Sequence, residues 1–539
     1  MSKEYSSKSM AHLGIVSGMI EELGIVQAID KHLQIDGKER DVSLGVLCKA
    51  LILNGLGFTQ RTLYMVSTFF EDKPIEVLLG DGIEPSQLND TTLGRCLDAI
   101  HSYGCTTLYA NMAAQICERL GLEPKTAHLD STDFHVEGVY NSKEVAVNEH
   151  VIHLRPGYSR DKRPDLNQVV LNLIVENQAG IALHMEGLDG NTSDKTAFNK
   201  TVREHIGQLQ AVFEIDYVVM DSAGYTEPTI KDCGEHTKWI SRVPETLKEC
   251  QQAVSGKYEN WENMTPGHKF VRVKSEYGGV EQRWLVIFSE ARYTREIVTL
   301  KKSYLKKSEA EYREFLKLSR VEFDCQKDAE KAVEGFIKKC KYISLQEIGY
   351  TEREVYEKTG RPRKGVSGVS KSYGIEAKVF CERAKFAVQA ERKGKFVVAT
   401  NELDEEKLSD QELLANYKGQ AKVERGFRFL KDPQFMAATL FVKKPERVEA
   451  LLFIMTLCLS VYAAIEYRVR EKLAADNETL PNQMGKEVKN PTMRWIFACF
   501  NGIHVLYTAE KRLVLNIKPL HLKVLNLLGQ KYLNYYFLN

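Results

Sequence analysis

The feature that most constrains the fold is an abrupt change of sequence pattern near residue 122. Before it, apolar residues recur at helical spacing in Ile15–Ile29, in Leu44–Leu56 and again over Thr92–Leu120. After it, short β-branched runs alternate with polar turns, beginning with the strand candidate Thr126–Val136. The chain therefore predicts a helical N-terminal region followed by a mixed α/β region.

The order of elements after residue 122 predicts one fold class. The pattern gives a strand, a hairpin, a helix, a strand, a helix and a strand: Thr126–Val136, Gln168–Val175 with Ile181–Gly187, Lys195–Gln210, Tyr217–Asp221, Glu227–Cys233 and Trp239–Val243. This order is typical of an RNase H-like α/β core, and other α/β folds share parts of it.

A longer stretch then interrupts the pattern. Charged helical segments at about 295–339 stand among strand candidates, and a basic loop, GRPRKG, occupies 360–365. The strand candidates are Phe270–Ser275, Arg283–Phe288, Phe380–Gln389 and Phe396–Thr400. Helices are predicted again over Ser409–Leu430, with Ser409 or Asp410 as the cap, and over Glu446–Leu473.

These patterns predict five consecutive regions. They are a helical N-terminal region at 1–122, the first part of the core at 123–245, an insertion at 246–402, the second part of the core at 403–475, and a helical C-terminal region at 476–539.

Cysteine usage and hydropathy predict a cytoplasmic protein. The eleven cysteines are scattered without a C-x-x-C pair, and an odd count disfavours a complete disulfide framework. The longest apolar run, Ala450–Ile465, falls short of the ~20 residues of a membrane span. We expect a buried core helix there, and no membrane partner.

The net charge of +1 hides an uneven distribution of charge. Residues 1–125 carry 11 Lys and Arg against 16 Asp and Glu, whereas 290–400 carry 26 against 17 and 410–539 carry 19 against 12. Such basic segments can neutralise nucleic-acid phosphates. They are equally consistent with solvated helix surfaces.

Two aspartates stand in strand candidates, where a charged group is costly without compensation. Asp130 lies within an apolar-flanked strand, and Asp221 ends another. A divalent cation would compensate both, because hard Mg²⁺ prefers carboxylate oxygens and two-metal phosphoryl transfer needs converging carboxylates. The alternative is that each aspartate caps a turn.

A third acid belongs to a polar stripe on the predicted helix Ser409–Leu430 and its end. Tyr417, Gln420, Glu424 and Lys431 are spaced 3, 4 and 7 residues apart. At about 100° per residue they fall within one ~60° stripe. An aromatic hydroxyl, an amide, a carboxylate and an amine on one face suit a site for metal and phosphate. A solvated helix face would give the same pattern.

These residues resemble motifs of the DDE transposases of bacterial and archaeal insertion sequences. The stripe is similar to the Y-x2-R-x3-E-x6-K motif, with Gln420 in place of Arg, and LDST (Leu129–Thr132) and VMDSAGY (Val219–Tyr225) resemble the strands of the first and second acids. GYSRDKRPDLNQVVL, DGNTSDKTAF, WISR, FVKKPERVEALL and PTMRW resemble further blocks. The helical N-terminal region resembles that of a long-chain subgroup.

The resemblance implies an RNase H-like core with a largely β insertion before the glutamate helix. It implies that Asp130, Asp221 and Glu424 hold two Mg²⁺, with Mn²⁺ as a substitute. The enzyme would hydrolyse DNA at the terminal inverted repeats of its element and transfer the freed 3′-OH into target DNA. A homodimer on paired ends in the nucleoid is implied, with residues 1–122 assigned to end binding or dimerisation.

The resemblance also implies DNA contacts. Tyr417 and Lys431 correspond to phosphate contacts near the element terminus. Gln420 can hydrogen-bond a phosphate but lacks the charge and bidentate fork of arginine. Arg428 lies nearby on the helix and would substitute only in part.

Other residues carry weaker predictions. Trp239 could stack on an unpaired base, although a strand tryptophan is more often core. Lys162 and Arg163, in a polar loop, could contact phosphates.

The first strand candidate also offers an alternative metal site. His128 and His135 could form a zinc site with Asp130, but strand alternation places the two histidines on opposite faces. The same alternation separates Asp133 from Asp130, so Asp133 is left out of the triad.

Two further function classes remain open from the sequence. One is a catalytically silent, transposase-derived DNA-binding protein, and the other is a stand-alone metal-dependent DNA nuclease. The presence of all three acids favours an active enzyme. Transfer of a 3′-OH end into a second duplex would separate a transposase from a nuclease.

Overall fold

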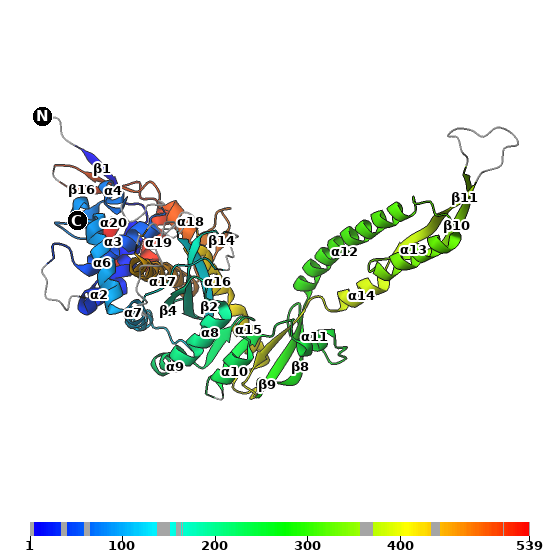
Figure 1. Ribbon diagram of the computed structural model, residues 1–539. Helices are drawn as coiled ribbons and strands as arrows, with labels where there is room; N and C mark the ends of the chain where they lie inside the picture. The colour runs from blue at the N-terminus through cyan, green and yellow to red at the C-terminus, as the bar shows by residue number, and fades with distance from the viewer. Residues whose placement is uncertain are drawn as a thin grey trace. The chain divides into compact units, whose positions relative to one another are not determined.

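The computed structural model describes residues 5–33, 40–58, 65–136, 151–157, 163, 165–234, 236–355, 370–432, 442, 444–509 and 511–537. They form two compact units (Figure 1). The first comprises residues up to 242, 275–283 and 399 onward, and the second comprises 243–274 and 284–398. Lys162 and the basic loop 360–365 lie outside the described residues.

The first unit contains a mixed sheet in which β4, β3, β2, β5 and β6 lie side by side in that order. Their bounds are β2 Thr126–Val136, β3 Asn167–Glu176, β4 Ala182–Asp189, β5 Tyr217–Met220 and β6 Trp239–Arg242. The strands β2, β3 and β4 pair antiparallel, whereas β2, β5 and β6 pair parallel. All five strands predicted in this region are present, with bounds that differ from the predicted ones by at most two residues at either end.

Helices cover both faces of this sheet. On one face, α8 packs on β2. On the other face, α7 and α17 pack on β4, and α16 packs on β2. The bounds are α7 Cys105–Leu120, α8 Asp194–Thr201, the π-helical turn η4 Val202–Ile206, α9 Gly207–Phe213, α10 Glu227–Cys233, α15 Asp410–Gly419, α16 Ala421–Leu430 and α17 Pro445–Ala475. Ser409 caps α15 through a reciprocal capping box with Glu412, as a serine followed by a glutamate predicts.

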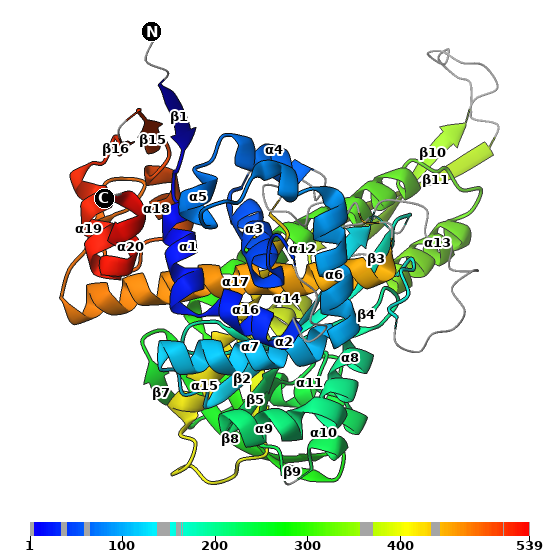
Figure 2. The same cartoon turned by 90° about the vertical axis from the view of Figure 1, so that its left-hand side faces the viewer.

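The N-terminal helices are packed around α17 (Figure 2). Contacts join α17 to α1, α3 and α6. The helices are α1 Leu13–Glu22, α2 Ile25–Leu33, α3 Leu44–Leu56, α4 Val66–Glu71, α5 Ile75–Leu78, η3 Pro85–Gln87 and α6 Asp90–Tyr103. α17 is the one described helix long and apolar enough to cross a membrane, and 83% of its apolar window is buried. The prediction of a buried core helix is confirmed.

The C-terminal region closes against the N-terminus. The strand β1 pairs with β15, which pairs with β16, and two glycines of α1 let the tyrosines of α20 approach closely. A Cβ on Gly14 would lie 2.7 Å from the Tyr536 ring, and one on Gly18 the same distance from Tyr532. The bounds are β1 Ser6–Ser9, β13 Leu480–Pro481, β14 Glu487–Val488, α18 Met493–Cys499, β15 His504–Tyr507, β16 Arg512–Leu515, α19 Pro519–Leu528 and α20 Gln530–Tyr536.

The second unit combines strands and helices. Its strands lie in the order β12, β9, β8, β7, with a separate β10–β11 hairpin. A small core forms around Phe315, Val333 and Ile375. The bounds are α11 Lys248–Ser255, β7 Glu262–Thr265, β8 His268–Tyr277, β9 Val280–Ser289, α12 Glu290–Leu318, α13 Gln326–Lys339, β10 Ile343–Val355, β11 Ser370–Cys381, α14 Arg383–Glu391 and β12 Lys395–Thr400.

Two sequence predictions for this unit need correction. The expectation of a largely β insertion is incomplete, because α12 alone spans 29 residues. The predicted strand Phe380–Gln389 is wrong over most of its length, since β11 ends at Cys381 and α14 begins at Arg383. The segment RAKFAVQAE is rich in good helix formers, and this preference prevails over its irregular apolar alternation.

Candidate active site

Asp130 and Asp221 are brought together by the parallel pairing of β2 with β5. The register runs from Thr126 beside Tyr217 to Leu129 beside Met220. Continuing it by one residue places Asp130 beside Asp221. Both side chains are partly exposed. Asp221 directly follows the end of β5, and Asp130 lies at the same level within β2.

Each aspartate also has a local structural role. Oδ1 of Asp130 accepts a hydrogen bond from the Ser131 N–H at 2.8 Å. Oδ1 of Asp221 accepts from the N–H groups of Ala223 and Gly224 at 2.8 and 3.3 Å. Asp221 therefore does cap a turn, as the alternative interpretation predicted, but with only one of its two carboxylate oxygens. This capping does not explain why the two carboxylates occupy neighbouring positions.

The helix of Glu424 runs alongside β2. At one end, the Gln420 amide donates to the carbonyl oxygen of Leu129 at 3.3 Å, and at the other, Lys431 Nζ lies 3.3 Å from Oδ1 of Asp133. Eleven helical residues span ~16 Å and four strand residues ~13 Å, so helix and strand run in the same direction. Glu424, four residues after Gln420, therefore lies level with the Asp130 region of β2. Its side chain is exposed.

Strand alternation puts Asp130 on the sheet face that α16 covers. Ser131 turns to the opposite face, where its hydroxyl donates to Asp194 of α8 at 2.6 Å. The close approach of the end of α15 to β2 requires Gly419, because a Cβ there would lie 2.8 Å from the His128 ring. The three acids thus offer carboxylate oxygens from adjacent strands and the helix beside them, a donor set that fits hard divalent cations.

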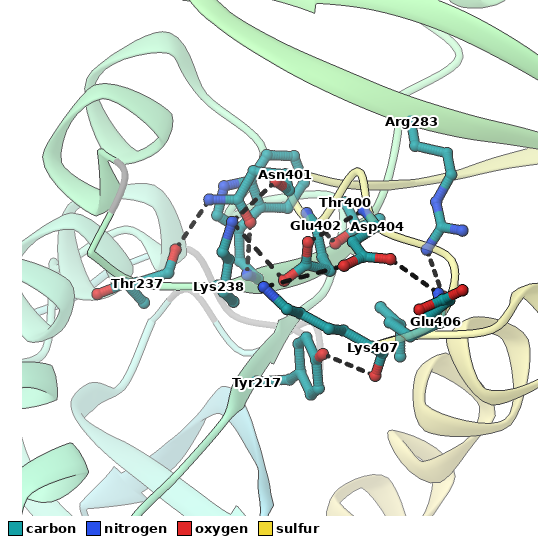
Figure 3. A network of polar contacts seen from close by, with 12 residues as sticks. Tyr217, Thr237, Lys238, Arg283, Thr400, Asn401, Glu402, Asp404, Glu406 and Lys407 are labelled. Carbon is teal, nitrogen blue, oxygen red and sulfur yellow. Dashed lines mark hydrogen bonds and ion pairs between the residues drawn. The ribbon is translucent and has the colours of Figure 1, made fainter.

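A polar network holds the start of α15, the helix that directly precedes α16 (Figure 3). Asn401 Oδ1 accepts from the backbone N–H of Trp239, which ties the segment after β12 to β6. The guanidinium of Arg283 donates to Asp410 Oδ1 at 3.2 Å and to the Leu408 carbonyl at 2.5 Å. Arg283 and Asp410 are both buried. Their ion pair anchors the first turn of α15 and, through it, the position of Glu424.

A groove that the sequence did not indicate lies beside α16. Its cavity of about 490 Å³ is lined by Lys422, Arg425 and Arg470, with aromatic side chains from Phe429, Tyr462 and Tyr467 and two acids, Glu466 and Glu471. Partial burial lowers the pKa of Lys422. The sequence does show that Lys422 and Arg425 are a basic pair at i, i+3 spacing on one helix. The groove itself forms only because α16 packs on α17, which contributes most of the other lining residues.

The residues predicted to contact DNA differ in their exposure and in their partners. Arg428 is exposed and Tyr417 partly exposed. Lys431 is paired with Asp133 and also lies over the Phe134 ring. Arg163 forms a two-pronged contact with Asp165, at 2.9 and 2.8 Å. Lys162 is not among the described residues.

Two predicted contacts need correction. Gln420 is only 7% exposed, and its amide is directed to Leu129 rather than to a surface where phosphate could bind. Trp239 is 0% exposed and packs edge-on against Tyr225, so its ring offers no surface for base stacking. The core alternative is the correct one for this tryptophan, because its side chain is fully buried.

The alternative zinc site on β2 does not form. His128 is fully buried, while His135 is partly exposed. Among the described residues, the set of three potential metal-ligating side chains whose ligand atoms all lie within 4.8 Å of one another is elsewhere, at His184, Glu186 and His205.

Comparison with known proteins gives two family matches. The family model described as "Transposase DDE domain" matches residues 123–461. A second model, "Domain of unknown function (DUF4277)", matches residues 5–114. No curated protein matches the chain. A solved structure of the piggyBac transposase synaptic complex with hairpin DNA is similar with a TM-score of 0.38 and 8% identity, covering 92% of this chain and 82% of that one.

Proposed function

Because the chain belongs to the transposase DDE domain family, whose members use divalent metal ions to cleave and transfer DNA, we propose that it binds the terminal inverted repeats of an insertion sequence and transfers their 3′-OH ends into target DNA. The observation that carries the proposal is the register of β2 and β5, which makes Asp130 and Asp221 neighbours. The run of α16 along β2 supplies the third acid, Glu424.

In this proposal Asp130, Asp221 and Glu424 hold two Mg²⁺ ions. When bound, such ions activate the attacking oxygen and stabilise the leaving oxygen of an in-line displacement. The chain positions these carboxylates through backbone hydrogen bonds to the two aspartates and through the Arg283–Asp410 ion pair at the start of α15, the helix that precedes α16. Exposure of Glu424 leaves the site open to a DNA strand.

The DNA would be held by side chains around the acids. Arg428 lies on α16 with Glu424, Tyr417 lies near the end of the preceding helix α15, and Lys431 directly follows α16. The groove lined by Lys422, Arg425 and Arg470 adds a basic and aromatic surface beside α16. Aromatic rings and cations together suit an unpaired or frayed strand end. We propose a homodimer on paired ends, because two ends must be joined.

The test uses full-length protein, Mg²⁺ and linear DNA carrying the sequences that flank the gene in its genome. We expect nicked, double-cut and joined products, and we expect none of them with Asp221→Asn. Cleavage without joining to a second duplex would favour the nuclease alternative. Specific binding of the flanking DNA without any cleavage would favour the catalytically silent DNA-binding protein.

A further inference from the structure

A second cluster of metal-ligating side chains lies on the opposite face of the sheet from the acids. His184 and Glu186 are two residues apart on β4 and therefore project from the same face. His205 reaches them from the π-helical turn η4. One ligand atom from each of the three lies within 4.8 Å of the other two.

Each of the three side chains has a buried polar atom that the protein leaves unsatisfied, although Glu186 and His205 are partly exposed. Within the described part of the chain, Nε2 of His184, Oε2 of Glu186 and Nε2 of His205 have no hydrogen-bond partner. His184 is only 3% exposed. Buried polar atoms without partners are rare and costly, so three that face one another call for a bound group. A cation coordinated by all three would satisfy them together.

The surroundings prepare these ligands for a metal. Lys200 Nζ donates to Oε1 of Glu186 at 2.6 Å, which fixes the carboxylate and leaves Oε2 directed to His205 at 3.9 Å. The two imidazole rings lie with centroids 4.6 Å apart.

The π-helical turn is the feature that delivers His205. The segment α8–η4–α9 is one continuous helical run in which residues 202–206 form a wider turn. An inserted turn of this kind rotates the following residues about the helix axis, and such turns are frequent at functional sites. It turns His205 toward β4.

From this geometry we infer that His184, Glu186 and His205 bind one Zn²⁺ ion, separate from the acids Asp130, Asp221 and Glu424. Two imidazoles and one carboxylate are a ligand set for zinc, whereas Mg²⁺ takes oxygen ligands and retains water. Three protein ligands leave a fourth tetrahedral position for water. The inference does not depend on the proposed function.

The ion would secure the helix that supports the acidic site. Ser131, Asn172 and Glu186 are paired across β2, β3 and β4 and form one row on this face. They contact Asp194, Thr201 and Lys200 of α8 in turn, at 2.6, 2.5 and 2.6 Å. Zinc would fix the β4 end of this row, while its other end lies beside Asp130.

The test is zinc retention by full-length protein dialysed in zinc-free buffer with excess Mg²⁺. We expect about one zinc per chain by elemental mass spectrometry, and less than a tenth of that in His205→Gln and Glu186→Gln. Asp130→Asn should retain the ion, which separates this site from the acidic one. His236→Gln, at an exposed histidine of the same unit, is the matched control and should also retain it.

Co²⁺ provides a second readout that does not depend on retention. The parent loaded with Co²⁺ should show visible d–d absorption of a four-coordinate site, and His205→Gln should lack it while keeping the parent's circular dichroism. Zn²⁺ should raise the melting temperature of the parent and not that of His205→Gln. A parent that retains no zinc, or a folded His205→Gln that retains it fully, would overturn the inference.

Discussion

Gln420 donates its side-chain amide to the carbonyl oxygen of Leu129, the residue directly before Asp130, at 3.3 Å. This hydrogen bond joins the start of the glutamate helix to the strand of the first acid. Arginine stands at this position in the motif that the helix resembles. Here the shorter, neutral side chain is buried and holds two elements of the site together, so its role is positioning.

Gln420→Ala should reduce DNA cleavage about tenfold to a hundredfold, because a small shift of Glu424 relative to the two aspartates is costly near the reacting phosphate. Affinity for the element ends should change little. Cleavage rates on intact and pre-nicked ends measure the effect, and Gln411→Ala, on the exposed side of α15, is the control. Gln420→Arg should lower the melting temperature, since it buries a cation beside His128. Parent-like cleavage by Gln420→Ala would disprove the positioning role.

Replacing the acids by their amides separates metal binding from turn capping. Asp130→Asn, Asp221→Asn and Glu424→Gln should abolish cleavage and joining, because an amide keeps a hydrogen-bond acceptor but loses the charge that holds a cation. Melting temperatures should stay near that of the parent, since Oδ1 of Asn still accepts the local backbone N–H bonds. The control is Asp216→Asn, an exposed aspartate before β5. If Asp221→Asn cleaves normally, its carboxylate only caps a turn.

Lys431→Ala should destabilise the protein by about 1–3 kcal/mol, because Asp133, whose side chain is 5% exposed, loses its cation. Adding Asp133→Asn should recover most of that loss, as a double-mutant cycle by thermal or urea unfolding can show. DNA affinity should remain reduced in the double variant if Lys431 also contacts a phosphate. If the double variant recovers both its DNA affinity and its stability in full, Lys431 serves only the ion pair with Asp133 and does not contact a phosphate.

Arg283→Ala should cost about 3–5 kcal/mol, since it removes the cation from beside the buried Asp410 carboxylate and with it the anchor of α15. Arg283→Lys should recover only part, because lysine lacks the fork that also reaches the Leu408 carbonyl. The exposed pair Arg313–Glu309 is the matched comparison, and Arg313→Ala should change stability by less than ~0.5 kcal/mol. Equal losses at the two sites in unfolding experiments would contradict the anchor.

His12 should contribute to acid sensitivity. Burial lowers its pKa from 6.5 to about 4, and its Nε2 lies 2.8 Å from the Leu56 carbonyl oxygen. As pH falls from 6.5 to 4, the unfolded chain takes up a proton that the folded chain does not, so stability is lost over that window. The contribution reaches at most ~3 kcal/mol. His12→Gln should show a shallower fall of unfolding free energy across this range, and an identical slope would refute the prediction.

Local pattern was enough to predict the elements that carry the site. Thr126–Val136 has the bounds that the sequence predicts, and of the two predicted caps, Ser409 and Asp410, the structure uses Ser409. Both signals are short-range, because strand alternation and capping depend on neighbours within a few residues. The segment Phe380–Gln389 failed for the same reason, since its helix-forming residues also fit an apolar strand pattern.

Tertiary structure decided which surfaces those elements present. The predicted helix Ser409–Leu430 forms as two helices, α15 and α16, which are divided at Gln420. The stripe therefore does not lie on one helix, and the sequence could not show that Gln420 turns inward to Leu129 or that Lys431 meets Asp133. Trp239 is core because it is fully buried and packs edge-on against Tyr225, a contact that its local sequence does not show. The cluster of His184, Glu186 and His205 joins a strand to a π-helical turn about twenty residues later, a spacing that matches no sequence motif. Burial and partner choice depend on contacts between distant segments, and these exist only once the chain has packed.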